Sequence, residues 1–289
     1  MKRYAGVVVL YQPDDEVVSH VKTYINAIEC LYVIDNSTNY NEYVIEKLNE
    51  IPKCKYVSLD GNKGLAVALN MGCNMAKEDG FDYILTMDQD SIFEEHAVEK
   101  MIQVVENSKE HLTIVAPNVT SVYPDEKGEM KQSYTLIPRM EEKVETWVMT
   151  SGSLMNLDDY LEVGGFDEQF FIAHIDVDLG IKMQRQGMKI LMYGDAMIYQ
   201  RFGNSKPKKI LWKTVHPWYE NSLRTYYLFR NQAYMIKKYG KECKSLIHVS
   251  LVNHIVKILL FEDKKIEKLK MAYKGNKDGK NGKMGQYHG

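Results

Sequence analysis

The chain has 289 residues and a formal net charge of −2, and 45% of its residues are hydrophobic and 26% charged. This composition is that of a globular protein with one large domain or one domain plus an extension, and so small a net charge gives no indication of nucleic-acid binding. The four cysteines (Cys30, Cys54, Cys73 and Cys243) lack the spacing of a zinc site or a disulfide framework, which predicts a reducing, cytoplasmic location.

Strand-like and helix-like segments alternate over residues 4–120. Runs rich in β-branched and aromatic residues lie at 4–11, 30–37, 54–60, 81–91 and 112–120. Segments with a helical spacing of apolar residues separate them, at 15–28, 40–51, 64–80 and 94–110. Strands that alternate with helices predict an α/β fold of Rossmann-like type, with a mostly parallel sheet and helices on both faces.

The remainder of the chain is less regular and then becomes helical. Further predicted elements are a strand, a turn of small residues and a short helix at 144–166, a helix at 175–187, and one or two strands at 188–203. Two long helices follow, at 223–240 and 244–261. The end of the chain, 274–289, is rich in Lys and Gly, which predicts disorder. The chain has no run of about 18 uncharged apolar residues, so we expect no membrane-spanning helix.

Two carboxylates one residue apart, Asp88 and Asp90, follow a strand of apolar residues. In an open α/β sheet, ligands bind outside the carboxyl ends of the strands. Two hard oxygen donors suit Mg²⁺ or Mn²⁺, which take further ligands from water and phosphate. The alternative is a polar turn in which Asp90 or Ser91 caps the next helix.

Polar groups also follow the first three predicted strands, at 4–11, 30–37 and 54–60. Gln12 follows the first strand, and Asp35-Asn36-Ser37 follows the second, where a carboxylate suits the imide N–H of uracil or thymine. Asn62-Lys63-Gly64 follows the third and precedes a helix, whose free N–H groups and dipole suit an anion. Each alone is an ordinary turn between a strand and a helix, but four polar strand ends at one edge predict a ligand site.

A second acidic pair, Asp176 and Asp178, lies in the first turn of the helix predicted at 175–187. Acids at a helix N-terminus stabilise it by up to about 1 kcal/mol, which is the structural explanation. The functional explanation is a general base for an acceptor hydroxyl, a task for a positioned and partly desolvated carboxylate.

The order of these motifs resembles the family 2 glycosyltransferases with the GT-A fold. The matching segments are VVVLYQP, DNST, GNKGLAVALNMG, TMDQDS, GGFDEQFF and IDVDLGIKMQRQG. Within that family the chain is similar to the bacterial rhamnosyltransferase group, which it also resembles in its helical RTYYLFRNQAYM segment. The resemblance implies a catalytic domain that binds nucleotide sugar and acceptor at 1–205, and a C-terminal helical extension at 206–289.

The resemblance also implies an activity, the inverting transfer of L-rhamnose from dTDP-rhamnose to a glycan or lipid-linked glycan in bacterial surface polysaccharide synthesis. Asp35 would contact the base, Asp88 the ribose or the metal's hydration shell, and Asp90 an Mg²⁺ or Mn²⁺ ion that bridges the diphosphate. Asp176 would be the general base. The other nucleotide-sugar contacts expected are Gln12, Asn36, Asn62, Lys63 and Gly64.

Two positions depart from the family pattern. Ile175 replaces the first acid of the family's acidic pair, which leaves Asp176 as its one carboxylate. Gln200 stands where members of the family often carry a His near the metal or the diphosphate. Since Gln is a weaker metal ligand than His, the alternative is that Arg201 neutralises phosphate charge.

Acceptor contacts are the least specific part of the sequence. Aromatic rings stack on sugar faces, so Trp147, His174 and Trp218 are candidates, together with the small residues Ser151 and Gly152. Each of these residues alone is also explained by a structural role, as Trp147 is by the apolar strand around it.

Partners and rival functions remain open from the sequence. Lys-rich helices at 244–274 with apolar faces predict either a peripheral contact with the inner face of the cell membrane or a packing or homodimer contact. The rival donor is a UDP-hexose. Two other functions are a sugar nucleotidyltransferase, which the acidic YQPDDE segment disfavours, and a non-catalytic nucleotide-sugar-binding protein.

Overall fold

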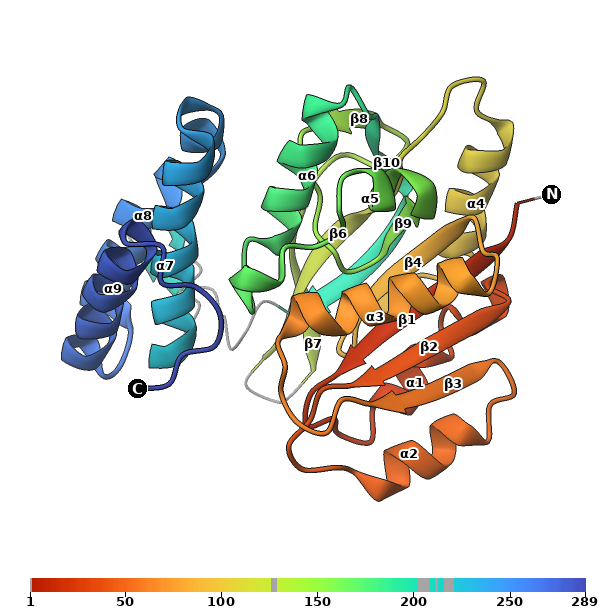
Figure 1. The fold of residues 1–289 in the computed structure, drawn as a ribbon, viewed down its shortest axis with the longest axis horizontal. Helices are drawn as coiled ribbons and strands as arrows, with labels where there is room; N and C mark the ends of the chain where they lie inside the picture. The colour runs from red at the N-terminus through yellow and green to blue at the C-terminus, as the bar shows by residue number, and fades with distance from the viewer. Residues whose placement is uncertain (1, 126–128, 202–207, 211–212, 216–220) are drawn as a thin grey trace. The chain divides into compact units, whose positions relative to one another are not determined.

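The computed structural model describes residues 2–125, 129–201, 208–210, 213–215 and 221–289 (Figure 1). The chain divides into two compact units. The first consists of Met1–Thr120, Tyr134–Glu168 and Ile175–Gln200, and the second of Ser121–Ser133, Gln169–His174 and Arg201–Gly289. The boundary expected near residue 205 therefore lies close to Arg201, but two earlier segments also belong to the second unit.

A ten-stranded mixed sheet forms the centre of the fold, with the strand order β3-β2-β1-β4-β9-β6-β10-β5 and with β7 and β8 paired to β6 and β10. The strands are β1 (Tyr4–Leu10), β2 (Cys30–Asp35), β3 (Cys54–Ser58), β4 (Tyr83–Asp88), β5 (Ile92–Phe93), β6 (Ile114–Pro124), β7 (Met130–Thr135), β8 (Glu142–Glu145), β9 (Ser153–Asn156) and β10 (Ile190–Arg201). The predicted α/β fold is confirmed.

The first four strands are parallel, and their register aligns their carboxyl ends. Val9 of β1 pairs with Asp88 of β4, and Leu10 of β1 pairs with Asp35 of β2. Strand β9 runs antiparallel beside β4, with Ser153 opposite Thr86. Parallel pairing thus joins β3, β2, β1 and β4, and because of the reversal at β9 the turn before β9 lies at the carboxyl end of β4.

Helices flank the sheet of the first unit (Figure 1). They are α1 (Val17–Val21), η1 (Ile25–Ala27), α2 (Glu42–Asn49), α3 (Leu65–Glu78), α4 (Ala97–Asn107), α5 (Leu157–Glu162) and α6 (Ile175–Arg185). Helix α3 packs on β1 and β2. It approaches so closely at Gly72 that a Cβ atom there would lie 2.3 Å from Val7 Cγ2, so only glycine fits at this contact.

The helix expected over 15–28 is shorter in the structure. It ends at Val21, and a separate turn of 3₁₀-helix follows. The amide and the hydroxyl of Thr23 both donate to the carbonyl of His20, at 3.0 and 2.7 Å. These bonds tighten the last turn and redirect the chain.

The second unit is mainly helical. It contains α7 (Ser222–Tyr239), α8 (Lys241–Phe261), α9 (Lys265–Lys280), the 3₁₀-helix η2 (Glu168–Phe170) at its boundary with the first unit, and a hairpin of β11 (Lys208–Ile210) and β12 (Lys213–Val215). Among the described residues, no helix is both long and apolar enough to span a membrane.

The prediction that residues 274–289 are disordered is wrong. Residues up to Lys280 form the second half of α9, and the last residues are anchored: the Tyr287 amide donates to the Tyr227 hydroxyl at 2.8 Å. Gly275 and Gly279 allow α9 to pack closely, whereas their presence in the sequence suggested a flexible segment. A Cβ atom on Gly279 would lie 2.0 Å from the Arg230 carbonyl oxygen, so these glycines let α9 pack directly against the backbone of α7.

Candidate active site

The Asp88–Asp90 turn is held in place by the turn before β9. The amide of Asp88 donates to Ser151 Oγ at 3.2 Å, and the Ser151 hydroxyl donates to Ser91 Oγ at 2.8 Å. Ser151 is only 2% exposed. Its side chain therefore shapes the acidic turn, a role that the sequence did not distinguish from acceptor binding.

Gly152, the next residue, is also structural in its contacts. It has a φ of +84°, and a Cβ atom would lie 2.7 Å from both Pro117 Cγ and Ile198 Cδ1. Its amide donates to the carbonyl of Thr86 at 2.7 Å. Both the backbone conformation and the lack of space call for glycine at this position.

Gln89, the middle residue of the acidic turn, fastens the turn to the end of β1. The Tyr11 amide donates to Gln89 Oε1 at 2.8 Å, and Gln89 Nε2 donates to the Tyr11 carbonyl at 3.2 Å. His20 Nδ1 lies 2.8 Å from the Gln89 carbonyl. Gln89 was not among the residues singled out from the sequence, although its amide group can both donate to and accept from a backbone.

Gln200, near the end of β10, contacts the acidic turn from across the sheet. Its Nε2 donates to Asp88 Oδ2 at 3.0 Å. Gln200 is 8% exposed, and its Oε1 is buried without a hydrogen-bond partner among the described residues. A buried acceptor of this kind is uncommon, and here it belongs to a side chain that is bonded to a carboxylate.

Asp88 and Asp90 are the candidate ligands for a hard divalent cation. Asp88 is half-buried, Asp90 is exposed, and Gln200 adds a buried amide oxygen. The described part of the chain has no cluster of three or more His, Cys, Asp and Glu residues suited to a metal. Two carboxylates and an amide match Mg²⁺ or Mn²⁺ sites, in which substrate phosphates and water complete the shell. Arg201 is exposed and begins the last segment of the second unit.

The ends of β2 and β3 are linked by a network of amide groups. Asn36 Nδ2 donates to Asn62 Oδ1 at 3.1 Å, and the Lys63 amide donates to Asn36 Oδ1 at 2.7 Å. The Gly64 amide donates to Asn62 Oδ1 at 3.0 Å. This network orders the turn that begins α3 and leaves the Lys63 side chain exposed. The N-terminus of α3 suits a phosphate group.

Asp35, at the end of β2, is fully buried. Its Oδ1 accepts from the Ser37 amide at 2.9 Å, and its Oδ2 accepts from the Tyr56 hydroxyl at 2.8 Å. The Ser37 hydroxyl in turn accepts from the Gln12 amide at 2.7 Å. Asp35 thus supports the turns at this edge in the structure, and its contact with a base stays a prediction. The Gln12 side chain is exposed there.

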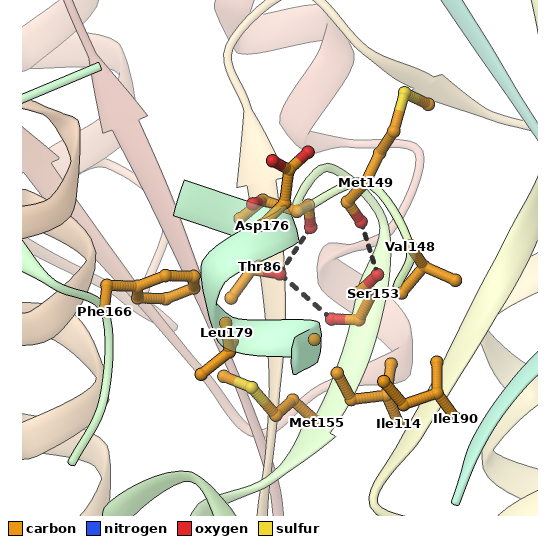
Figure 2. A pocket seen from close by; sticks show the side chains of 12 residues that line it. Thr86, Ile114, Val148, Met149, Ser153, Met155, Phe166, Asp176, Leu179 and Ile190 are labelled. Atoms are coloured by element: carbon orange, nitrogen blue, oxygen red, sulfur yellow. Dashed lines mark hydrogen bonds between the residues drawn. The ribbon is translucent and has the colours of Figure 1, made fainter. Parts of the chain in front are cut away.

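Asp176 lies in the first turn of α6, beside the carboxyl end of β4. It lines a cavity of about 20 Å³ together with Thr86 of β4 and Thr150. Figure 2 shows its carboxylate directed away from the apolar side chains of Leu179 and Met155 that line the same cavity. The cavity is far smaller than a sugar, so it is a gap in the packing beneath the carboxylate.

The surroundings of Asp176 make its carboxylate a stronger base. Burial raises its pKa to about 6, although the Val177 amide donates to its Oδ1 at 2.9 Å and lowers the pKa. Asp178 differs: it is fully buried, with Lys182 Nζ 3.4 Å away. The pair that looked alike in the sequence therefore divides into one carboxylate suited to proton transfer and one inside an ion pair.

The remaining acceptor candidates are placed separately. Trp147 is half-buried and packs against α6, where a Cβ atom on Gly180 would lie 2.4 Å from Trp147 Cβ. His174 belongs to the second unit, and its buried Nδ1 has no hydrogen-bond partner among the described residues. Burial lowers the pKa of His174 to about 4, so the ring is neutral near pH 7. Trp218 lies outside the described residues.

Comparisons with known proteins agree on one family. Residues 15–174 match the model of "Glycosyl transferase family 2". The dTDP-rhamnosyl transferase RfbF of Shigella flexneri is 24% identical over 297 aligned positions, which cover 97% of this chain and 96% of RfbF.

Solved structures agree on the fold. A crystal structure of GalNAc-T7 with UDP, GalNAc and Mn²⁺ has a TM-score of 0.62 at 14% identity, and S. aureus TarS has a TM-score of 0.55 at 13% identity. These matches cover 95% and 90% of this chain. The chain spans 54% of the GalNAc-T7 chain and 44% of the TarS chain.

Proposed function

This chain belongs to glycosyl transferase family 2, and we propose that it is an inverting glycosyltransferase that moves L-rhamnose from dTDP-rhamnose to a hydroxyl group of a glycan or lipid-linked glycan. The observation that carries the proposal is the position of Asp176, a carboxylate of raised pKa beside the strand that ends in Asp88. The relative from Shigella flexneri, a dTDP-rhamnosyl transferase, supports the choice of donor.

The catalytic step follows from the chemistry of Asp176. Its carboxylate takes the proton of the acceptor hydroxyl as that oxygen attacks the anomeric carbon, and the bond to the nucleoside diphosphate breaks on the opposite face. A single displacement inverts the anomeric configuration. The second carboxylate that a retaining glycosidase uses as its nucleophile is not needed.

The leaving diphosphate gains negative charge in this step. Lys63 and the N-terminus of α3 supply positive potential at the edge of the sheet. Asp88, Asp90 and Gln200 would hold an Mg²⁺ or Mn²⁺ ion, which when bound supplies Lewis-acid stabilisation of phosphate oxygens. GalNAc-T7, crystallised with UDP and Mn²⁺, supports this assignment by its fold.

A thermal-shift panel tests the donor. A ligand at about 100 times its Kd stabilises the folded state by about 2.7 kcal/mol, which corresponds to a rise in Tm of about 5 °C or more for a chain of this size. We expect that rise with dTDP and dTDP-rhamnose in the presence of Mn²⁺, and a smaller one with UDP or GDP. Thymidine, which lacks the diphosphate, is the control. A preference for UDP would replace rhamnose by a hexose as the donor sugar, and no response to any nucleotide would contradict the proposal.

The metal ligands are tested separately. Asp90→Asn removes a charged oxygen donor, and we expect the Mn²⁺ concentration for half-maximal turnover to rise about 10- to 100-fold. EDTA should lower the turnover of the unchanged protein, and added Mn²⁺ should restore it. The matched control is Glu95→Gln, an acid that is 87% exposed and lies outside the proposed site. An unchanged Mn²⁺ requirement in Asp90→Asn would remove Asp90 from the ligand set.

Two rival functions are less well supported. A sugar nucleotidyltransferase needs a basic, glycine-rich loop after the first strand, and this chain has the acidic YQPDDE segment there. A non-catalytic binding protein has no use for a carboxylate of raised pKa at Asp176.

A further inference from the structure

Two adjacent buried side chains on α7, Arg230 and Asn231, bind the backbone of the segment 169–174. They are 1% and 0% exposed. They are part of the RTYYLFRNQAYM motif, to which neither the sequence nor the proposed chemistry gives a task. A buried guanidinium group needs many hydrogen-bond acceptors, and here the acceptors are main-chain carbonyls.

Asn231 makes the larger number of contacts with the segment. Its Nδ2 donates to the carbonyls of Phe170, Ile172 and Ala173 at 3.1, 2.6 and 2.9 Å. Its Oδ1 accepts from Arg230 Nε at 2.9 Å. The bond from Arg230 fixes the orientation of the amide, so that its NH₂ group faces the segment.

Arg230 holds the start of the same segment and joins it to the end of the chain. Its Nη2 donates to the carbonyls of Phe170 and Gln169 at 2.8 and 3.3 Å, and its Nη1 donates to the carbonyl of Gly285. The Gly285 amide donates to the Gln169 carbonyl at 2.8 Å. The guanidinium also lies 4.7 Å from the centre of the Tyr227 ring.

The bound segment has an unfavourable backbone conformation. Phe171, Ala173 and His174 have φ values of 62°, 66° and 62°, and none of them is glycine. Non-glycine residues at positive φ are uncommon and persist only where the surroundings enforce them. Besides the hydrogen bonds, the Phe171 ring stacks on Tyr227, with centres 5.1 Å apart.

The preceding residues are also fixed from a distant helix. Asn70 of α3 donates from Nδ2 to the Phe166 carbonyl at 3.0 Å, and its Oδ1 accepts from the Phe166 amide at 3.0 Å. At its other end the segment continues, through the peptide bond of His174 and Ile175, into α6, whose second residue is Asp176.

We propose that Arg230 and Asn231 are positioning residues, which hold the segment 169–174 in its strained conformation and thereby fix the backbone that leads directly into Asp176. This inference rests on the proposed role of Asp176 as the base. The segment would otherwise relax toward ordinary φ values, and the carboxylate would lose its alignment with the acceptor hydroxyl. A shift of about 1 Å in a catalytic group is enough to lower turnover about 100-fold.

Asn231→Asp tests the proposal in the full chain. It keeps the size of the side chain and the oxygen that faces Arg230, but it replaces the NH₂ donor by an oxygen that repels three carbonyls. Arg230→Lys is the second variant, which keeps the charge and loses the planar fork. Thr225→Val is the control: Thr225 is also on α7 and fully buried, and its hydroxyl donates to the carbonyl of Asn221, the N-cap of the same helix.

Three measurements are compared in each variant: hydrogen exchange of peptides that cover 166–176, dTDP binding by calorimetry, and kcat with its pH profile. For Asn231→Asp we expect exchange in 169–174 to rise about 10-fold or more, kcat to fall about 100-fold with the dTDP Kd unchanged, and the acid limb of the pH profile to move. Arg230→Lys should show smaller changes in the same direction, and Thr225→Val none.

The outcomes separate this inference from the proposed function. Unchanged exchange in both variants overturns the inference, as does full turnover in a variant with raised exchange. Loss of dTDP binding together with turnover also overturns it, because that result indicates general unfolding. If the unchanged protein turns over no nucleotide sugar, the proposed function fails, and the exchange measurement still decides whether Arg230 and Asn231 hold the segment.

Discussion

Asp176→Asn is expected to lower kcat by about 1,000-fold, within the range of general-base catalysis, and to leave dTDP binding unchanged. The amide has nearly the shape of the carboxylate but cannot take a proton from the acceptor hydroxyl. The proposed binding groups after β2 and β3 and in the Asp88–Asp90 turn are untouched by the change. The measurement is single-turnover transfer with saturating donor, paired with calorimetry of dTDP.

The control for this variant is Asp158→Asn. Asp158 is also an acid in the first turn of a helix, α5, but its side chain is 71% exposed and pairs with Lys77 at 2.6 Å. If an acid at a helix N-terminus matters only through the helix dipole, both variants should lose a little stability and neither should lose turnover. Full turnover in Asp176→Asn would assign the base to another residue.

The role of Asp176 as the base also predicts the direction in which activity changes with pH. Burial raises the pKa of Asp176 to about 6. A general base works only when unprotonated, so kcat/KM should fall as the pH falls through about 6 and should level off above it. Residual activity of Asp176→Asn should lack this acid limb. A limb that persists in the variant would belong to another group.

Gly279→Ala is expected to have the largest effect on stability. In the interior of an exposed helix, Ala is favoured over Gly by about 1 kcal/mol. Here the sign reverses, because the added Cβ would lie 2.0 Å from the Arg230 carbonyl oxygen and 3.0 Å from Ala233 Cβ. Both groups are on α7, whose backbone would have to move. We expect the free energy of unfolding of the second unit to fall by about 3 kcal/mol, the upper part of the range for overpacking.

Thermal and urea denaturation of Gly279→Ala, followed by circular dichroism, measures this loss. Lys277→Ala, an exposed change two residues earlier on α9, is the control and should be neutral or slightly stabilising. If Gly279→Ala were as stable as the unchanged protein, α7 and α9 would not be in direct backbone contact at this position.

The sheet was predictable from the sequence because its signals are local. Apolar runs of strand length and helices of regular spacing report on nearest neighbours along the chain, as at 30–37 and 64–80. The sequence also singled out the Asp88–Asp90 turn and Asp176, because several polar strand ends fall together at one edge of the sheet; their roles stay predictions. The order of strands beyond β4 was not found, because nothing in the four residues of β9 specifies that they run antiparallel.

The supporting contacts of the site were not predictable, because they join residues far apart in sequence. Gln89 pairs with the backbone of Tyr11, and Asn70 with that of Phe166. A side-chain amide that binds main-chain groups leaves no pattern in the partner, whose side chain plays no part. The prediction for residues 274–289 was wrong for a different reason: a segment rich in Gly and Lys resembles a flexible linker by composition, and only the position of α7 reveals that Gly275 and Gly279 form a packing surface.

The contacts of the segment 169–174 have a consequence for how the protein is made. The strands β1 to β4 are synthesised first, and the helices that pack on them lie between them in the chain. The partners of this segment are made later: Arg230 and Asn231 with α7, and Gly285 after α9. At about 5–20 residues per second, the segment 169–174 waits several seconds for these partners. If Arg230 and Asn231 hold the segment as we propose, the backbone before Asp176 reaches its final conformation only after the residues up to Gly285 have been made.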